Sequence, residues 1–299
     1  MILSCPSKTF LLGEYLVLNG GPSLLLGTEP RFELRVQRGT GVSPFHPESP
    51  AGKLWARFAN ITGQWSAEFV NPSSLGGLGA SGAEFLLLYS AIKASQAVSV
   101  EAQLEQDHSE MLQLYWELSS QKGARPSGAD LVAQARGGVT LFERSQGRLE
   151  STSWGFPNLG FILFSTGHKT PTHEHLQSLG EWDSSALENL TRQALQAHRI
   201  KHEQNFVDSV RKVRETLKFL GFEAPATTKI IDEVGKAPSI RAIKGCGALG
   251  ADVICALVDD KDIPRISDLL SRKYTIIANH HHLSEGLFFK STHVLEAQP

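Results

Sequence analysis

The feature that most constrains the fold is a glycine-rich segment that leads directly into an apolar one. Glycines stand at positions 76, 77, 79 and 82, and the mostly apolar stretch Ala83–Ile92 follows without a break. Glycine lets a backbone approach a ligand closely, and the free N–H groups at the start of a helix attract an anion. The pattern therefore predicts a loop that enters a buried helix. On glycine content alone, a tight structural turn explains the segment equally well.

The spacing of these glycines excludes two common nucleotide motifs. No Gly-Lys-Ser/Thr follows the loop, and the glycines do not fit the dinucleotide fingerprint. Ser81 stands among them, and its hydroxyl is suited to a phosphate-bound metal.

The order of the remaining segments predicts two domains, which the length of 299 residues permits. In the first half, alternation or apolar character predicts strands at 32–36, 65–70 and 139–142, and helical spacing predicts a helix over 101–121. The second half reads strand, helix, strand, strand, helix, strand, a split βαβ arrangement, over 161–164, 184–220, 240–243, 253–258, 264–272 and 274–278. Trp-Gly-Phe-Pro-Asn at 154–158 is the expected seam between domains 1–156 and 157–299.

Composition limits the kinds of partner and the cellular compartment that we expect for this protein. Lys and Arg number 29 against 31 Asp and Glu, a balance that disfavours a general nucleic-acid binder. The three cysteines form no close pair, which favours a reducing environment without disulfides. No basic N-terminal region precedes an apolar run, and no stretch approaches the ~18 apolar residues of a membrane span. We expect a cytoplasmic protein without a nucleic-acid or membrane partner.

Three further segments carry residue types that can do chemistry. Asp130 follows Ser-Gly-Ala at an expected helix start, where a carboxylate either caps the helix or orients and deprotonates a substrate hydroxyl. Lys8 and Glu14 flank an apolar strand near the N-terminus, and 244–252 is a second turn of small residues. Each of these segments alone has an ordinary structural explanation.

The histidines favour structural roles. His198 and His202 stand four apart on a predicted helix, a spacing that can bind zinc, but no Glu follows the first His as in metalloprotease helices. We expect them to be a surface pair. His280, His281 and His282 are expected in a loop or at a strand end.

Taken together, the segments resemble the GHMP small-molecule kinases, named for galactokinase, homoserine kinase, mevalonate kinase and phosphomevalonate kinase. Pro6–Tyr15 resembles the family's Pro-Gly-Lys…Gly-Glu segment, with Ser7 in place of Gly. Gly77–Ala83 resembles its phosphate loop, Gly-Leu-Gly-Ser-Ser-x-Ala. Lys244–Asp252 resembles its third motif, Gly-Ala-Gly-Gly-Gly, with Leu249 and Ala251 in place of two glycines.

Within the family, the details are most similar to the phosphomevalonate kinases, with the mevalonate kinases next. Gly13-Glu14-Tyr15 resembles their Gly-Glu-Tyr, and Ser127–Leu131 followed by Gly137-Gly138 resembles their Ser-Gly-x-Asp-Val…Gly-Gly. Thr166–Thr172 resembles their Thr-Gly-x-x-Ala-Ser-Thr. The magnesium-binding Glu of mevalonate kinases has no gap-free match here. Glu117 is the nearest candidate, and Gln121 is the alternative.

The resemblance implies an α+β fold of two domains, an N-terminal phosphate-loop domain and a C-terminal ferredoxin-like domain, with the site between them. It implies ATP and Mg²⁺ as cofactors and 5-phosphomevalonate as the acceptor. Mevalonate kinase or another kinase of the family is the first alternative, and a non-catalytic metabolite-binding relative is the second. The sequence leaves open whether the protein forms a homodimer.

The resemblance also assigns roles to residues. Asp130 and Lys8 would be catalytic. Ser81 and Glu117 would hold the metal. The ATP phosphates would lie on Gly77, Leu78, Gly79, Ala80, Ser81 and Gly82. The acceptor would contact Glu14, Tyr15, Ser127, Gly128, His168, Lys169, Thr170, Gly247 and Ala248.

Overall fold

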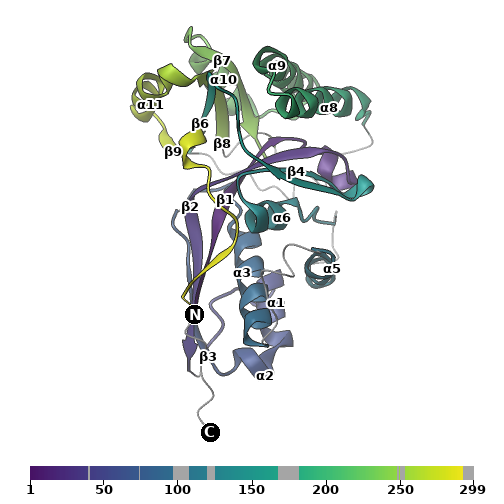
Figure 1. Cartoon of the computed structure of the whole chain (residues 1–299), viewed down its shortest axis with the longest axis vertical. Helices are drawn as coiled ribbons and strands as arrows, with labels where there is room; N and C mark the ends of the chain where they lie inside the picture. The colour runs from purple at the N-terminus through teal and green to yellow at the C-terminus, as the bar shows by residue number, and fades with distance from the viewer. Residues whose placement is uncertain are drawn as a thin grey trace.

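The computed structural model describes residues 1–39, 41–73, 75–96, 108–119, 125–167, 182–247, 249 and 253–291. These residues form two antiparallel sheets stacked end to end along the long axis of the molecule (Figure 1). Among the helices that the structure describes, none combines the length and the apolar character that a bilayer crossing requires.

The first sheet is built mainly from the N-terminal half. Its described strands run in the order β10-β1-β2-β4-β5, and β3 pairs with β2 beside this path. Their bounds are β1 Ile2–Leu12, β2 Ser23–Arg38, β3 Trp65–Val70, β4 Val139–Glu143, β5 Arg148–Thr152 and β10 Phe288–Ser291. The strands expected at 65–70 and 139–142 are confirmed, and that expected at 32–36 is part of the longer β2.

Helices cover one face of this sheet (Figure 1). Helix α3 (Ala80–Ser95) lies against β1 and β2 and is buried along Phe85–Ile92, which explains its apolar sequence. Helix α6 (Ala129–Arg136) contacts α3 and packs against β1, β2 and β4. The outer helices are α1 (Pro50–Arg57), α2 (Ala59–Thr62) and α5 (Ser109–Leu118). Of the helix expected over 101–121, only α5 falls within the described residues.

The second sheet has the strand order β7-β8-β6-β9, with all pairs antiparallel. Its elements are β6 Leu159–Ser165, α8 Ser185–Arg199, α9 Glu203–Phe219, α10 Pro225–Val234, β7 Ile240–Cys246, β8 Val253–Asp259, α11 Ile263–Ser271 and β9 Thr275–Asn279. This order is that of a ferredoxin-like sheet, so the predicted α+β class and the split βαβ arrangement are confirmed.

Strand β6 shows why the second half reads as uninterrupted apolar runs. Phe161 and Leu163 join the cluster that holds α8 and α9, whereas Ile162 and Phe164 join the cluster that holds α10 and α11. Both faces of the sheet are therefore covered, and neither face needs polar residues.

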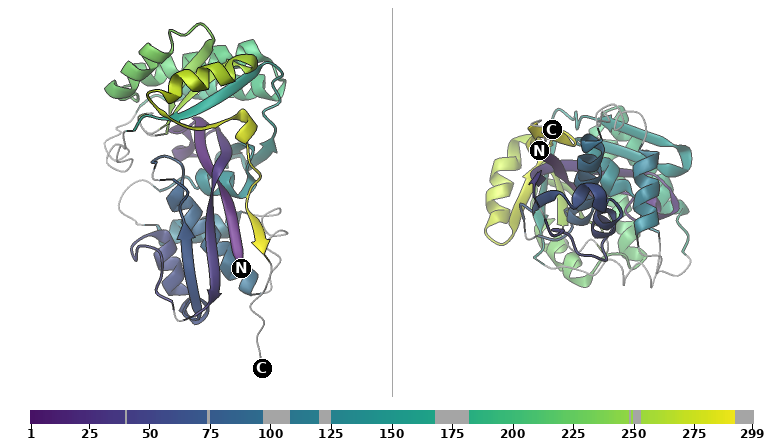
Figure 2. Two further views of the ribbon diagram at one scale, coloured as in Figure 1. Left: turned by 90° about the vertical axis from the view of Figure 1, so that its left-hand side faces the viewer. Right: turned by 90° about the horizontal axis from the view of Figure 1, so that it is seen from below.

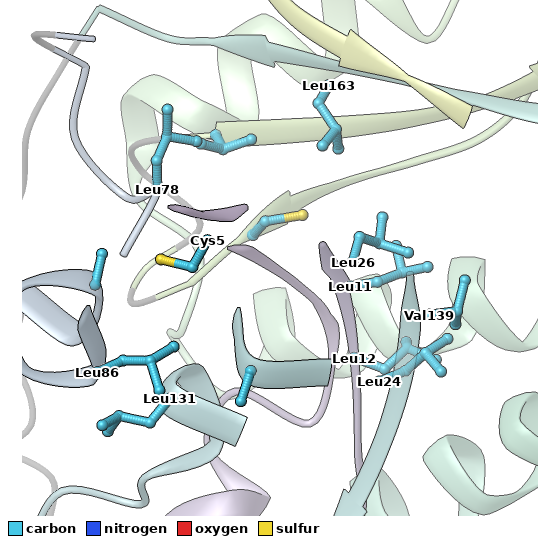
Figure 3. Packing of buried hydrophobic residues seen from close by; sticks show 14 of the residues in the cluster. Cys5, Leu11, Leu12, Leu24, Leu26, Leu78, Leu86, Leu131, Val139 and Leu163 are labelled. Atoms are coloured by element: carbon cyan, nitrogen blue, oxygen red, sulfur yellow. The ribbon is translucent and has the colours of Figure 1, made fainter. Parts of the chain in front are cut away.

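The first of these clusters continues without interruption from one sheet to the other. Figure 3 shows residues of it from several elements, including Leu78 of the glycine loop, Cys5 of β1, Leu86 of α3 and Leu131 of α6. The three cysteines are free and buried.

The chain crosses between the sheets twice. It leaves the first sheet through 153–158 and returns through 280–287 to β10, which pairs with β1. The returning segment runs down the side of the first sheet (Figure 2). The Arg31 guanidinium fastens it there by donating to Ser284 Oγ and to the carbonyls of Glu285 and Gly286 at 2.6–2.7 Å. The last strand of the chain thus belongs to the first sheet.

Two expectations for the second half were wrong. The helix predicted over 184–220 is two helices, because Lys201 takes a left-handed φ of 58° and the His202 side chain caps α9 by accepting from Asn205 N–H. His198 and His202 are also not a surface pair. His198 is 1% exposed and packs against the rings of Trp154, Phe156 and Phe206.

The buried His198 makes stability depend on pH. Burial, with a smaller contribution from Lys201, lowers its pKa to about 4. In the unfolded chain its pKa is about 6.5, so between these values the unfolded state binds more protons and stability falls as the pH falls. We predict that His198→Phe removes up to about 3 kcal/mol of the stability lost between about pH 6.5 and pH 4. Urea unfolding across this range measures it.

The exposed His46 supplies the matched control. His46→Gln should retain the acid loss of the wild type. An equally steep acid loss in folded His198→Phe would contradict the prediction.

Candidate functional site

The glycine loop is fixed to strand β1 before it enters α3. Gly77 and Gly79 have φ values of 80° and 90°, a left-handed conformation that favours glycine. Leu78 between them is buried, and its carbonyl accepts the Lys8 backbone N–H at 2.9 Å. The loop therefore has a rigid base, and the N-terminus of α3 follows it at once.

Two glycines of the loop face side chains from other elements. A Cβ on Gly79 would lie 2.7 Å from Lys8 Cγ, and a Cβ on Gly82 would lie 3.0 Å from Asp130 Oδ2. Real Cβ atoms essentially never show the first distance, and the second is tighter than nine in ten real Cβ contacts. The fold thus brings Lys8 of β1, the glycine loop and Asp130 of α6 together, although Lys8 and Asp130 are far apart in sequence.

Gln134 joins these three parts, and sequence analysis missed it. Its Nε2 donates to the carbonyls of Pro6 and Gly79, each at 3.1 Å, and the residue is fully buried. Its Oε1 lies 2.8 Å from where a Cβ of Gly82 would be and has no hydrogen-bond partner among the described residues. One signal was present: Gln134 is four residues after Asp130, on the same helix face, in an otherwise small and apolar stretch.

Asp130 lies in the first turn of α6, where the helix dipole favours a negative charge. It does not cap the helix: Gly128 is the N-cap residue, and Ser127 Oγ accepts the Ala129 N–H at 3.2 Å. Gly128 has a φ of 77°, and a Cβ there would lie 2.3 Å from Leu112 Cδ2. Burial, followed by the charge of Asp130, raises the pKa of the Tyr115 hydroxyl, so that tyrosine stays neutral.

The second sheet reaches this region through a buried ion pair. Lys244 Nζ donates to Glu14 Oε1 at 2.7 Å, and the two side chains are 0% and 5% exposed. Burial opposes the charge on Lys244, but Glu14, together with Cys246 and Cys255, raises the pKa of Lys244 above its ordinary value. Burial raises the pKa of the neighbouring Cys246 thiol to about 11, although the charge of Lys244 acts to lower it. This thiol is therefore not a nucleophile at neutral pH.

A second contact holds the turn that follows β7. The Leu249 N–H donates to the Tyr15 hydroxyl at 2.8 Å, and the Tyr15 ring stacks on Phe222 at 4.4 Å. Leu249 has a φ of 55° and Gly247 one of 79°, so both are left-handed. Leucine thus takes a conformation that favours glycine.

The candidate site contains some of the oxygen ligands that Mg²⁺ would need. Magnesium takes oxygen ligands, and Ser81 in the exposed first turn of α3 and the carboxylate facing Gly82 from Asp130 are of this kind. The Glu117 carboxylate is 57% exposed and engaged in an ion pair with Arg57 at 2.6 Å. The remaining expected site residues, Gln121, His168, Lys169, Thr170 and Ala248, lie outside the described residues.

A cavity of about 430 Å³ lies elsewhere, between β7, α9 and α10. Two of its cations are already paired: Arg214 with Glu223 and Asp232, and Arg241 with Glu203 and Asp259. The convergence of loop, lysine and carboxylate therefore identifies the candidate site better than cavity size does.

Comparison with known proteins identifies the fold. No protein-family model matches the chain, and a sequence search of curated proteins finds no significant match. Among solved structures, Methanococcus jannaschii mevalonate kinase matches with a TM-score of 0.72 at 16% identity, over 95% of this chain and 98% of that one. Streptococcus pneumoniae phosphomevalonate kinase matches with 0.73 at 16%, over 93% and 98%. Lactococcus lactis galactokinase matches with 0.71 at 13%, over 96% and 94%. The chain has the GHMP-kinase fold, as its motifs predict.

The contacts of Gln134 generate a prediction about the loop. Gln134→Met keeps the volume but removes the amide that donates to the carbonyls of Pro6 and Gly79. Unfolding free energy should fall by about 1–3 kcal/mol, and amide exchange in 76–82 should become faster. Urea unfolding and hydrogen exchange by mass spectrometry measure these effects.

Gln193, an exposed residue of α8, provides the control. Gln193→Met should change neither stability nor exchange. Wild-type exchange of the loop in the Gln134→Met protein would show that Gln134 does not hold it.

Proposed function

We propose that the chain is an ATP-dependent kinase that transfers the γ-phosphoryl group to a small molecule. The observation that carries the proposal is the convergence of Lys8, the Gly79–Gly82 loop and Asp130. Phosphoryl transfer needs positioning and charge stabilisation more than covalent participation by the protein. A helix N-terminus for phosphates, one cation and one carboxylate meet these needs.

Within this reaction, we assign 5-phosphomevalonate as the acceptor. Support comes from the Gly-Glu-Tyr, Ser-Gly-x-Asp and Thr166–Thr172 segments. The Streptococcus pneumoniae phosphomevalonate kinase of the same fold was solved in complex with phosphomevalonate and AMPPNP. An oxygen of the acceptor phosphate would bond to the γ-phosphorus while the bond from that phosphorus to the β–γ bridging oxygen breaks. ADP leaves with the electron pair, and the product is a diphosphate.

The glycine loop would bind the ATP phosphates through its backbone. Gly77–Gly82 precede and open α3, whose first N–H groups have no acceptor within the helix. In the proposal, Ser81 helps to hold Mg²⁺, which would neutralise phosphate charge when bound. Glu117, the other proposed ligand, is paired with Arg57 in this structure.

Asp130 and Lys8 would act on the transferring group. A phosphate oxygen is already acidic, so Asp130 would mainly orient this acceptor; with an alcohol acceptor it would also take the proton. The Lys8 ammonium would stabilise the charge that builds on the phosphoryl group. Glu14 and Tyr15 would act by holding the turn at 247–249, and Ser127 and Gly128 by setting the start of α6.

An acceptor panel tests the proposed reaction. ADP release should require Mg²⁺ and should be fastest with 5-phosphomevalonate, compared with mevalonate, galactose and homoserine. In the proposal, Lys169, with His168 and Thr170, contacts the acceptor's own phosphate, so Lys169→Ala should raise KM for 5-phosphomevalonate and leave KM for ATP unchanged. Faster turnover of mevalonate would assign the alternative kinase. Absence of ADP release with every acceptor tested would support the non-catalytic alternative.

Substitutions at Asp130 and Lys8 test the mechanism itself. Asp130→Asn keeps the shape beside Gly82 and should lower kcat by about 10²–10⁴-fold with little change in ATP binding. Lys8→Met keeps the stem on which Gly79 packs and should also lower kcat. If the two residues act as a unit, their double variant should lose much less than the product of the single losses.

Asp208→Asn is the control, because this carboxylate lies on α9 and pairs with Arg211 at the surface. Its kcat should equal that of the wild type. A folded Asp130→Asn protein with near-normal turnover would exclude Asp130 from the reaction.

A further inference from the structure

A cluster of metal-ligating side chains lies apart from the proposed active site, where the chain leaves the second sheet. Asp260, His280 and His281 offer ligand atoms that all lie within 4.8 Å of one another. Asp260 Oδ1 lies 2.9 Å from His280 Nε2 and 3.8 Å from His281 Nε2, and the two imidazole rings are 3.8 Å apart. None of these residues has a part in the proposed phosphoryl transfer.

The backbone presents these side chains in a fixed arrangement. Residues His280–His282 form a short 3-10 helix capped by Asn279, whose Oδ1 accepts the His281 N–H at 2.9 Å. His282 Nδ1 accepts the Asn279 N–H, so this third histidine turns back to its own cap. On the other side, the Asp260 N–H donates to the Asn158 carbonyl at 2.9 Å. The His280 and His281 rings are left to face Asp260.

The fold also reserves space for the His280 ring. A Cβ on Gly160 would lie 2.6 Å from His280 Nδ1 and 2.8 Å from its Cε1, so no larger residue fits beneath the ring. Asp260 Oδ1 is itself buried and accepts no aligned hydrogen bond from the part of the chain that the structure describes, although His280 Nε2 is 2.9 Å away. Asp260 Oδ1 and His280 Nε2 are thus close together without forming an aligned hydrogen bond, an arrangement that suits two ligands of one metal ion.

The ligand chemistry selects the class of ion. Around a tetrahedral Zn²⁺, ligand atoms at ~2.0–2.1 Å are separated by about 3.3 Å, a value that the distances of Asp260 Oδ1 from the two imidazole nitrogens bracket. Two imidazoles and one carboxylate suit Zn²⁺, whereas Mg²⁺ and Ca²⁺ prefer all-oxygen sites. We propose that Asp260, His280 and His281 bind one Zn²⁺, with solvent in the fourth position.

The place of the site indicates its effect. Asp260 follows β8 and is tied to Asn158 in the first crossing between the sheets, while His280 and His281 begin the second crossing. Below them, Ser284 N–H donates to the Gly27 carbonyl and Leu287 N–H to the Ala135 carbonyl at the end of α6. A bound ion would join the two crossings and stabilise the folded chain by mass action.

Calorimetric titration of the EDTA-treated full chain with ZnCl₂ tests the proposal. The wild type should bind one Zn²⁺ that Asp260→Asn and His281→Ala each weaken by at least about tenfold. At one Zn²⁺ concentration, the Tm should rise less in both variants than in the wild type. Co²⁺ in place of Zn²⁺ should give the visible absorption of a tetrahedral N/O site in the wild type only.

His282→Ala is the matched control, since it removes the adjacent histidine that faces Asn279, and its Zn²⁺ affinity should equal that of the wild type. Circular dichroism in EDTA checks that the variants fold. Wild-type affinity in both Asp260→Asn and His281→Ala, or no saturable Zn²⁺ binding by the wild type, overturns the proposal. Neither result bears on the kinase proposal, which rests on other residues.

Discussion

The buried ion pair between Lys244 and Glu14 is the contact on which the arrangement of the two sheets around the candidate site depends. Lys244 is fully buried in β7 of the second sheet, and Glu14 follows β1 of the first. Removing one partner of such a pair leaves an uncompensated charge in the interior, which costs about 3–5 kcal/mol. The pair therefore fixes which turn of the second sheet faces the N-terminal segment, and Tyr15 secures that turn beside it.

A backbone contact fixes the glycine loop to the first sheet. Lys8 holds the loop through its backbone N–H, which donates to the Leu78 carbonyl. The Gln134 side chain donates to two carbonyls, one on β1 and one on the loop. It thereby sets the spacing between β1, which carries Lys8, and α6, which carries Asp130. The glycines at 79 and 82 leave room for side chains from β1 and α6.

What the sequence predicted well is what local pattern determines. The strand at 65–70, the strand after Gly137-Gly138 and the loop before α3 follow from alternation and glycine placement, and the second-half order follows from apolar runs. What it missed depends on partners distant in sequence. Gln134 reaches Pro6 across 128 positions, and Glu117 pairs with Arg57 across 60. The break at Lys201 was also hidden, because lysine in a left-handed conformation has no local signature.

Leu249 shows how a departure from a family motif can be structurally compatible with the fold. A side chain in the left-handed region costs roughly 1–2 kcal/mol, and glycine avoids this cost. Here the strained residue is held from both sides: its N–H donates to the Tyr15 hydroxyl, and its carbonyl accepts the Ala224 N–H at 3.0 Å. Each such bond contributes about 0.5–1.5 kcal/mol, so the two together offset the strain. The turn keeps a glycine-like path at this position, and the substitution alone gives no reason to assign the chain a non-catalytic role.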